Sequence, residues 1–349
     1  MMKTLSLAVI LPVALLAGAS VAHAAADPLD RPAVASALAP RSLLTAVTHA
    51  GERIVAVGER GHILLSDDAG VSWRQVRVPT SVTLTSVRFA DARLGWAVGH
   101  GGVILRTVDG GATWTKQLDG RAAAQLVLDA TPKGDVQAVA EAERLVRDGP
   151  DKPFFDLLVK NGREVLAIGA YGLIFETLDG GASWQPVLDR VPNPERKHLY
   201  AIRADGDAVY LAGEQGLLLR SNDGGRRFTV LDSPYVGSFF GLVVAPGGAL
   251  LALGLRGNLY RSADGGAAWT KLELPTQSSF TGAVALGDGS VVLLDEAGTV
   301  WLSRDRGMAF DRQPQGRAFP FLDAVELAGG GLLAVGARGT ATLSLAPAK

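Results

Sequence analysis

The sequence predicts an all-β chain that forms one seven-bladed β-propeller. A motif of Ser or Thr, Asp, Gly and an aromatic residue, spaced as in TLDGGASW (177–184), occurs six times. A glycine hairpin of the type VGERGHILLS (57–66) occurs seven times, and the steps between successive hairpin glycines are 41, 70, 44, 41, 41 and 41 residues. A period near 40 built from short strands and glycine turns is typical of propeller blades.

Each repeat contains four candidate strands. In the fifth repeat they cover residues 239–245, 249–255, 259–263 and 268–274. Glycine tolerates positive φ, so it suits the tight hairpin between the second and third strands. The hairpin glycines are Gly61, Gly102, Gly172, Gly216, Gly257, Gly298 and Gly339.

The Asp motif falls in the turn between the third and fourth strands of each repeat. A short carboxylate at such a turn accepts hydrogen bonds from nearby backbone N–H groups, and the Ser or Thr hydroxyl adds another bond. The aromatic residue, Trp184 in the quoted copy, then packs against the neighbouring blade. We therefore expect a structural and not a catalytic role for these carboxylates, which are Asp68, Asp109, Asp179, Asp223, Asp264 and Asp305.

The N-terminus has the features of a secretory signal over residues 1–24. Lys3 is followed by an apolar run over residues 5–19, and AHA (22–24) is a small-x-small cleavage site. The alternative is an N-terminal membrane anchor, but the run is short for a bilayer span. We expect cleavage near Ala24, no stable membrane insertion afterwards, and a soluble periplasmic protein.

The propeller is expected to cover residues 41–349. The seventh repeat stops before its fourth strand, and an unpaired edge would promote aggregation. Residues 25–40 precede the first blade, and the stretch 29–38 is a candidate for the strand that closes the last blade.

The long step of 70 residues predicts a helical insertion over about residues 120–152, between blades two and three. Asp135 is a candidate N-cap, and Val136, Val139, Leu145 and Val146 fall on one face of the helix, which Gly149 and Pro150 end. The insertion shares a face with the glycine hairpins, as does the charged loop at 191–200. It is either a lid or docking element, or a loop packed on the rim.

Composition limits the possible functions. With 34 Lys and Arg against 35 Asp and Glu, the chain is close to neutral, so nucleic acid is not an expected partner. There are no cysteines, and the five histidines show no HxH or HExxH spacing, so we expect no metal and no cofactor.

The Asp motifs, the glycine hairpins and the segments DGPDKPFFD (148–156), GAYGLIFETLDGGASW (169–184) and LAGEQGLLLRS (211–221) resemble the photosystem II stability/assembly factor family. The resemblance covers about residues 43–345 and is strongest to the branch in non-photosynthetic bacteria, whose genes often lie beside exporters of the resistance-nodulation-division type. It implies a monomeric, non-catalytic module that binds a membrane-protein subunit or complex.

The hairpins offer the candidate partner-binding residues, which are Arg60, His100, Tyr171, Arg256 and Arg338, with Gln215 beside them. Three arginines on one rim can hold a carboxylate bidentately, or they are solvated turn residues. Glu59, Glu214 and Glu296 dilute the positive charge. This departs from the arginine-lined face expected of photosynthetic members, so a photosystem, an exporter and another complex all stay open as partners.

A glycosidase of the sialidase type is the alternative function, because such enzymes share the Asp motif. The RIP segment of sialidases is missing from the sequence, and no tyrosine has a recognisable catalytic setting. The discriminating feature is a pair of carboxylates that converges at the centre of the propeller.

Overall fold

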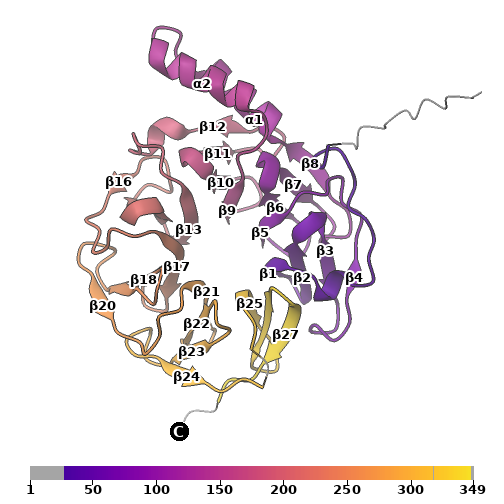
Figure 1. The fold of residues 1–349 in the computed structure, drawn as a ribbon, viewed down its shortest axis with the longest axis vertical. Coiled ribbons are helices and arrows are strands. Elements are labelled where there is room, and N and C mark those ends of the chain that lie inside the picture. Colours follow the sequence, from indigo (N-terminus) through magenta and orange to yellow (C-terminus); the bar gives the residue numbers. More distant parts are fainter. Residues whose placement is uncertain (1–26, 317, 347–349) are drawn as a thin grey trace, which may run out of the picture.

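The computed structural model describes residues 27–316 and 318–346, and they form a ring of seven antiparallel sheets (Figure 1). Six sheets have four strands and the last has three. The prediction of a seven-bladed propeller is therefore confirmed. The expected signal over residues 1–24 lies outside the described residues.

The first three blades are built as follows. Blade one contains β1 (Leu44–Ala50), β2 (Arg53–Gly58), β3 (Ile63–Ser66) and β4 (Arg74–Gln75). Blade two contains β5 (Leu84–Phe89), β6 (Gly95–Gly99), β7 (Ile104–Thr107) and β8 (Thr115–Leu118). Blade three contains β9 (Phe154–Val159), β10 (Val165–Gly169), β11 (Ile174–Thr177) and β12 (Gln185–Pro186).

The other four blades repeat this order. Blade four contains β13 (Leu199–Asp205), β14 (Ala208–Gly213), β15 (Leu218–Ser221) and β16 (Thr229–Val230). Blade five contains β17 (Phe239–Ala245), β18 (Ala249–Gly254), β19 (Leu259–Ser262) and β20 (Thr270–Leu272). Blade six contains β21 (Phe280–Ala285), β22 (Val291–Asp295), β23 (Val300–Ser303) and β24 (Asp311–Gln313), and blade seven contains β25 (Phe321–Glu326), β26 (Leu332–Gly336) and β27 (Gly339–Leu343). The strands expected for the fifth repeat agree with β17 to β20 to within two residues.

The described residues also contain six short 3-10 turns. They are η1 (Ala39–Arg41), η2 (Glu59–Gly61), η3 (His100–Gly102), η4 (Ala170–Gly172), η5 (Leu188–Arg190) and η6 (Glu214–Gly216). Four of them, η2, η3, η4 and η6, form the glycine hairpins of the first four blades.

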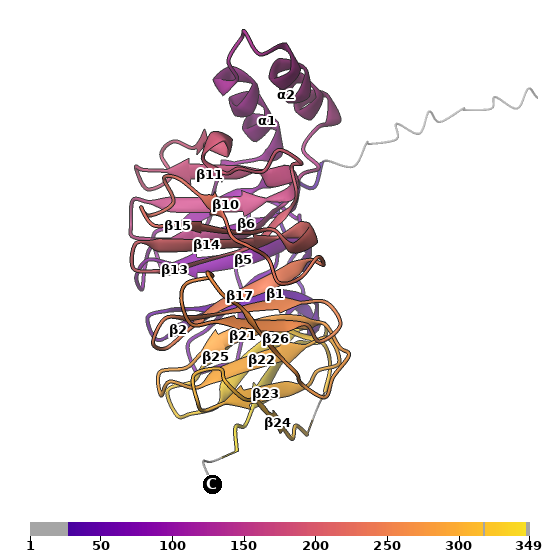
Figure 2. The same cartoon turned by 90° about the vertical axis from the view of Figure 1, so that its left-hand side faces the viewer.

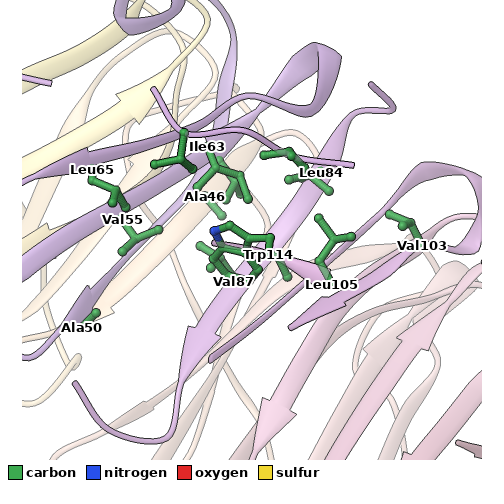
Figure 3. Close-up of a cluster of buried hydrophobic side chains, with 14 of the residues drawn as sticks. Ala46, Ala50, Val55, Ile63, Leu65, Leu84, Val87, Val103, Leu105 and Trp114 are labelled. Atoms are coloured by element: carbon green, nitrogen blue, oxygen red, sulfur yellow. The ribbon is translucent and has the colours of Figure 1, made fainter. Parts of the chain in front are cut away.

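The hydrophobic core lies between neighbouring blades. Figure 3 shows one such layer, in which Trp114 of the second Asp motif packs among Val55 and Leu65 of blade one and Val87 of blade two. Trp184 packs in the same way beside Trp96 of the preceding blade. Large apolar side chains from facing sheets are thus removed from water together, which stabilises the ring.

All six Asp motifs form the expected lock. In the first, the Ser66 hydroxyl donates to Asp68 over 2.8 Å, and the N–H groups of Gly70 and Ser72 donate to Ser66 Oγ and to Asp68, each over 2.8 Å. The hydrogen bond from the Ser72 hydroxyl, followed by that from its N–H group, lowers the pKa of Asp68. The other five carboxyls also have lowered pKa values.

The expectation that residues 29–38 close blade seven as a fourth strand was wrong. Residues 28–36 run along blade one instead: Ala33 N–H donates to the Val78 carbonyl, and Ser36 N–H donates to the Gln75 side chain. Leu29 is 2% exposed and belongs to the core between blades one and two. That buried position holds the segment away from blade seven, whose sheet has three strands among the described residues.

The ring closes through contacts of the kind that join the other blades. A Cβ on Gly339 would lie 2.0 Å from the Pro40 carbonyl oxygen, much as one on Gly257 would lie 2.4 Å from that of Thr276. Residues 39–42 therefore stand where the connector after a blade normally stands. Val47 N–H also donates to Asp323 of blade seven over 3.1 Å.

The insertion has two helices, where the sequence predicted one capped helix. Helix α1 (Gly120–Ala130) is N-capped by Asp119, and α2 (Val136–Asp148) is N-capped by Asp135 as expected. The expected apolar face of α2 was partly wrong, because Val136 is 80% exposed and Val146 is also exposed, whereas Ala142 is buried. Figures 1 and 2 show that the helical hairpin projects outward from the ring beyond β12.

Candidate functional site

The five candidate residues all lie in hairpins on one face of the ring. This hairpin face carries the turns between the second and third strands of each blade and the connectors from each blade to the next. The residues come from blades one, two, three, five and seven, and all are exposed: they are Arg60, His100, Tyr171, Arg256 and Arg338. Among the described residues, no hydrogen bond or ion pair joins any two of them.

Several of these side chains occupy a strained backbone position. Arg60, Tyr171 and Arg256 have φ values of 56°, 55° and 53°. Gln215 shares this conformation, and in blade two the position is taken by Gly101, with His100 one residue earlier. A left-handed conformation costs a non-glycine residue about 1–2 kcal/mol. The fold accepts glycine at this position, so these larger side chains are retained at a cost to stability.

The three arginines are available to bind another molecule. In the part of the chain that the structure describes, the guanidinium groups of Arg60, Arg256 and Arg338 form neither a hydrogen bond nor an ion pair. The neighbouring glutamates accept backbone N–H groups of the connectors instead. Glu214 accepts the N–H of His198 over 3.1 Å, and Glu296 accepts that of Ser279 over 2.9 Å.

A run of aromatic rings crosses the hairpin face from blade three to blade five. We call it the aromatic stripe; it consists of Tyr171, His198, Phe155, Tyr200 and Phe240. Ring centroids lie 4.8 Å apart for Tyr171 and His198 and again for Tyr200 and Phe240, and 5.2 Å apart for Phe155 and Tyr200. Sequence reasoning selected only Tyr171, because the other four residues stand far from it in the chain.

The aromatic stripe is partly open to solvent. Tyr171 is 50% exposed and Phe240 is 38% exposed. The ammonium group of Lys152 lies 5.3 Å from the centre of the Tyr171 ring, a cation–π contact. Burial, and then the charge of Glu214, raise the pKa of Tyr200, so its hydroxyl is neutral at pH 7.

The insertion borders a pocket of about 760 Å³ against blade three. The pocket lining includes Val127, Ala142, Leu145, Tyr171, Leu188 and Arg196. Arg196 forms an ion pair with Glu141 of α2 and so ties the insertion to the loop at 191–200. Tyr171 belongs to the pocket and to the aromatic stripe, which makes the two surfaces continuous.

Four charged side chains meet around the axis of the ring. Arg203 donates to Asp156 over 2.5 Å, and Arg88 lies 3.9 Å from Asp156 and 3.8 Å from Asp323. Burial alone would raise the pKa of Asp156, but Arg203 and Arg88 lower it, whereas burial raises the pKa of Asp323. The sequence did not single out these residues, because only the closed ring brings blades two, three, four and seven together.

Two further findings concern the described residues alone. Within residues 27–316 and 318–346, no group of three or more His, Cys, Asp or Glu side chains is placed to hold a metal ion. No helix in the same ranges is both long and apolar enough to cross a membrane.

Sequence comparison matches residues 65–131 and 149–235 to the family described as photosynthesis system II assembly factor YCF48. The photosystem II assembly lipoprotein Ycf48 of Synechococcus sp. (strain CC9902) is 39% identical over 64 residues. The chloroplastic photosystem II stability/assembly factor HCF136 of Cyanidioschyzon merolae (strain NIES-3377 / 10D) is 45% identical over 47 residues. These matches cover 18% and 13% of this chain, and 19% and 11% of the two relatives.

Solved structures share the fold over most of their length. YCF48 bound to a D1 peptide has a TM-score of 0.65 at 16% identity, covering 88% of this chain and 94% of that one. A streptogramin B lyase has a TM-score of 0.69 at 13% identity, covering 90% and 97%. At such identities these similarities concern the fold alone, whereas the family match spans the first four Asp motifs. The two matched segments make up less than half of the chain, and these sequence matches support a photosystem II assembly factor-like family.

Proposed function

We propose that this protein is a periplasmic binding module that recognises a membrane-protein partner through its hairpin face. One observation carries the proposal: Arg60, Arg256 and Arg338 are exposed on one face without partners among the described residues, and two of them are held in a strained backbone conformation. Strain that the fold does not require is often kept for function. The YCF48 structure with a D1 peptide supports peptide binding by this fold.

The proposed partner is a membrane-protein subunit or complex with an acidic segment. A guanidinium group holds a carboxylate through two parallel hydrogen bonds, which gives geometric selectivity as well as affinity. The partner is a photosystem, an exporter of the resistance-nodulation-division type or another complex, and its identity follows from the experiment below.

The test is co-purification from detergent-solubilised membranes of the cells that make this protein. The variant carries Arg60→Gly, Arg256→Gly and Arg338→Ala, because glycine relieves the strain at the first two positions. We expect the wild type to recover one membrane complex and the variant to lose it while unfolding at the same or a higher temperature. The matched control is Arg226→Ala with Arg227→Ala, which removes exposed arginines from an Asp-motif turn on the opposite face. Equal recovery by wild type and hairpin variant would refute the role of this face.

We also propose that binding occurs without catalysis. The carboxylates that converge at the axis, Asp156 and Asp323, lie beside arginines, and Asp156 additionally accepts the Ser86 hydroxyl over 2.8 Å. These contacts suit a brace between blades better than an acid and a nucleophile. Hydrolysis of a panel of fluorogenic glycosides or sialosides that is lost in Asp323→Asn would overturn this proposal.

A further inference from the structure

The seven blades provide an internal comparison at one position, the second residue of each innermost strand. In blades one, two and six this residue is a threonine whose hydroxyl donates to the next blade. Thr45 donates to the Leu84 carbonyl over 2.6 Å, Thr85 to that of Phe154 over 2.7 Å, and Thr281 to that of Phe321 over 2.6 Å. Threonine is therefore the residue that joins blades at this position.

Blades three, four and five carry Phe155, Tyr200 and Phe240 at the same position, and blade seven carries Leu322. These rings give up the hydrogen bond between blades and place apolar surface where the innermost strands begin, on the hairpin face. The three aromatic residues lie on neighbouring blades and form a continuous surface. Their ring centroids are 4.8 Å apart for Tyr200 and Phe240, and 5.2 Å apart for Phe155 and Tyr200. The rings pack against one another, yet Phe240 stays 38% exposed and Tyr171 50% exposed, and this exposed apolar surface indicates a contact with another molecule.

The charges around the aromatic stripe identify what fits it. Arg256 lies in the hairpin that follows Gly254, and Gly254 pairs with Phe239, the residue before Phe240. The hairpin that carries Arg256 thus borders the Phe240 end of the stripe, and the Arg256 guanidinium group has no partner among the described residues. At the other end, Tyr171 continues into the pocket of about 760 Å³ beside α2. This layout suits an extended chain with apolar side chains along its length and a carboxylate at one end.

We propose that the aromatic stripe binds an extended peptide segment of the partner that carries a large apolar or aromatic side chain next to an acidic residue. The rings of the stripe contact the apolar side chain, and Arg256 pairs with the carboxylate. Edge and offset contacts between aromatic rings add to the area that they bury, and such residues dominate binding at interfaces. This inference rests on the proposed binding function and names its principal contact.

The test selects ligands without knowledge of the partner. Random peptides displayed on phage are panned against the purified protein, and a labelled synthetic copy of the most enriched peptide is titrated by fluorescence anisotropy. We expect the enriched sequences to combine an aromatic or large aliphatic residue with Asp or Glu. The key variant is Phe155→Thr with Tyr200→Thr and Phe240→Thr, which recreates the residue found in blades one, two and six.

We expect this triple variant to fold and to bind the peptide at least about tenfold more weakly. Phe240→Thr alone should weaken binding to a smaller extent, which covers the case in which the triple variant does not fold. Thr281→Val is the matched control: it removes a hydrogen bond between blades on the far side of the ring and should lower stability without changing binding.

The inference is overturned if no peptide is enriched, if the enriched peptides lack apolar residues, or if the threonine variants bind like the wild type. Its failure is distinguishable from failure of the proposed function. Co-purification that depends on the hairpin arginines but not on the stripe refutes the inference alone. Peptide binding that depends on the stripe, without any membrane partner, supports the inference and refutes the proposed function.

Discussion

At the scale of single residues, the hairpins separate positions that serve the fold from positions that do not. The hairpin glycines serve it, because a Cβ on Gly61 would lie 2.2 Å from the Thr80 carbonyl oxygen. The preceding residue is different: Gly101 takes the left-handed conformation in blade two, but Arg60, Tyr171, Gln215 and Arg256 take it elsewhere. A side chain at this position lowers stability, so its chemistry must be explained by function or by chance.

Replacing Gln215 by glycine should therefore stabilise the protein. Relief of the left-handed strain at φ 51° is expected to raise the free energy of unfolding by about 1 kcal/mol. Chemical denaturation measures the change. The control is Ala297→Gly in the corresponding turn of blade six, where φ is not positive; glycine there adds only unfolded-state entropy and should be neutral or destabilising. Equal effects of both substitutions would contradict the strain argument.

At the scale of structural elements, the Asp motif is a lock whose strength depends on ionisation. In the third motif, the Ser183 hydroxyl, then its N–H group, then the Thr177 hydroxyl hold the pKa of Asp179 well below the ordinary value of 3.8. The folded state therefore binds the proton more weakly than the unfolded state does. Each such carboxylate adds stability that is fully present above pH 3.8 and disappears as the pH falls through the folded-state pKa.

Acid should accordingly weaken the propeller at its turns. We expect the thermal unfolding midpoint to hold steady down to about pH 4 and to fall below it, since six carboxyls have lowered pKa values. Asp179→Asn should be less stable than the wild type at pH 7, and the difference should shrink below pH 3.8. The contribution of Asp323 to stability depends on pH in the opposite direction, because burial raises its pKa. Its ionisation therefore lowers stability as the pH rises. A wild-type to Asp179→Asn difference that stays constant with pH would exclude the ionised lock.

At the scale of the whole molecule, the ring closes without a shared strand among the described residues. The same contact between an Asp-motif glycine and a leucine occurs at the closure and elsewhere in the ring. A Cβ on Gly70 of blade one would lie 2.7 Å from the Leu333 side chain of blade seven, and a Cβ on Gly111 of blade two would lie 3.1 Å from the Leu65 side chain of blade one. Each Asp-motif turn thus packs on the preceding blade, including across the junction between the chain ends. The N-terminal segment is free to cover blade one instead.

The role of that segment can be measured with Leu29→Ala. Loss of a side chain that is 2% exposed is expected to lower the free energy of unfolding by about 2–5 kcal/mol. Hydrogen exchange should show lost protection in blades one and two, at residues 78–89, and none in β27. Val34→Ala, in the same segment but 70% exposed, is the control and should have little effect. Lost protection confined to β27 would instead revive the closing strand.

The sequence by itself determined the repeat, the number of blades and the face on which the candidate residues lie. These features follow from local rules: glycine where φ is positive, and Asp where a turn needs an acceptor. The N-cap at Asp135 belongs to the same class, because a cap is decided within one turn of a helix.

Only the tertiary structure decided what depends on closure of the ring. Leu29 packs in the core between blades one and two, and Ala142, not Val136, is buried on α2. The rings of Phe155, Tyr200 and Phe240 contact one another across three blades. The same is true of Arg88, Asp156, Arg203 and Asp323, which come from four blades. Such contacts are settled by packing between distant segments, and a local pattern holds no information about which distant surface will cover it.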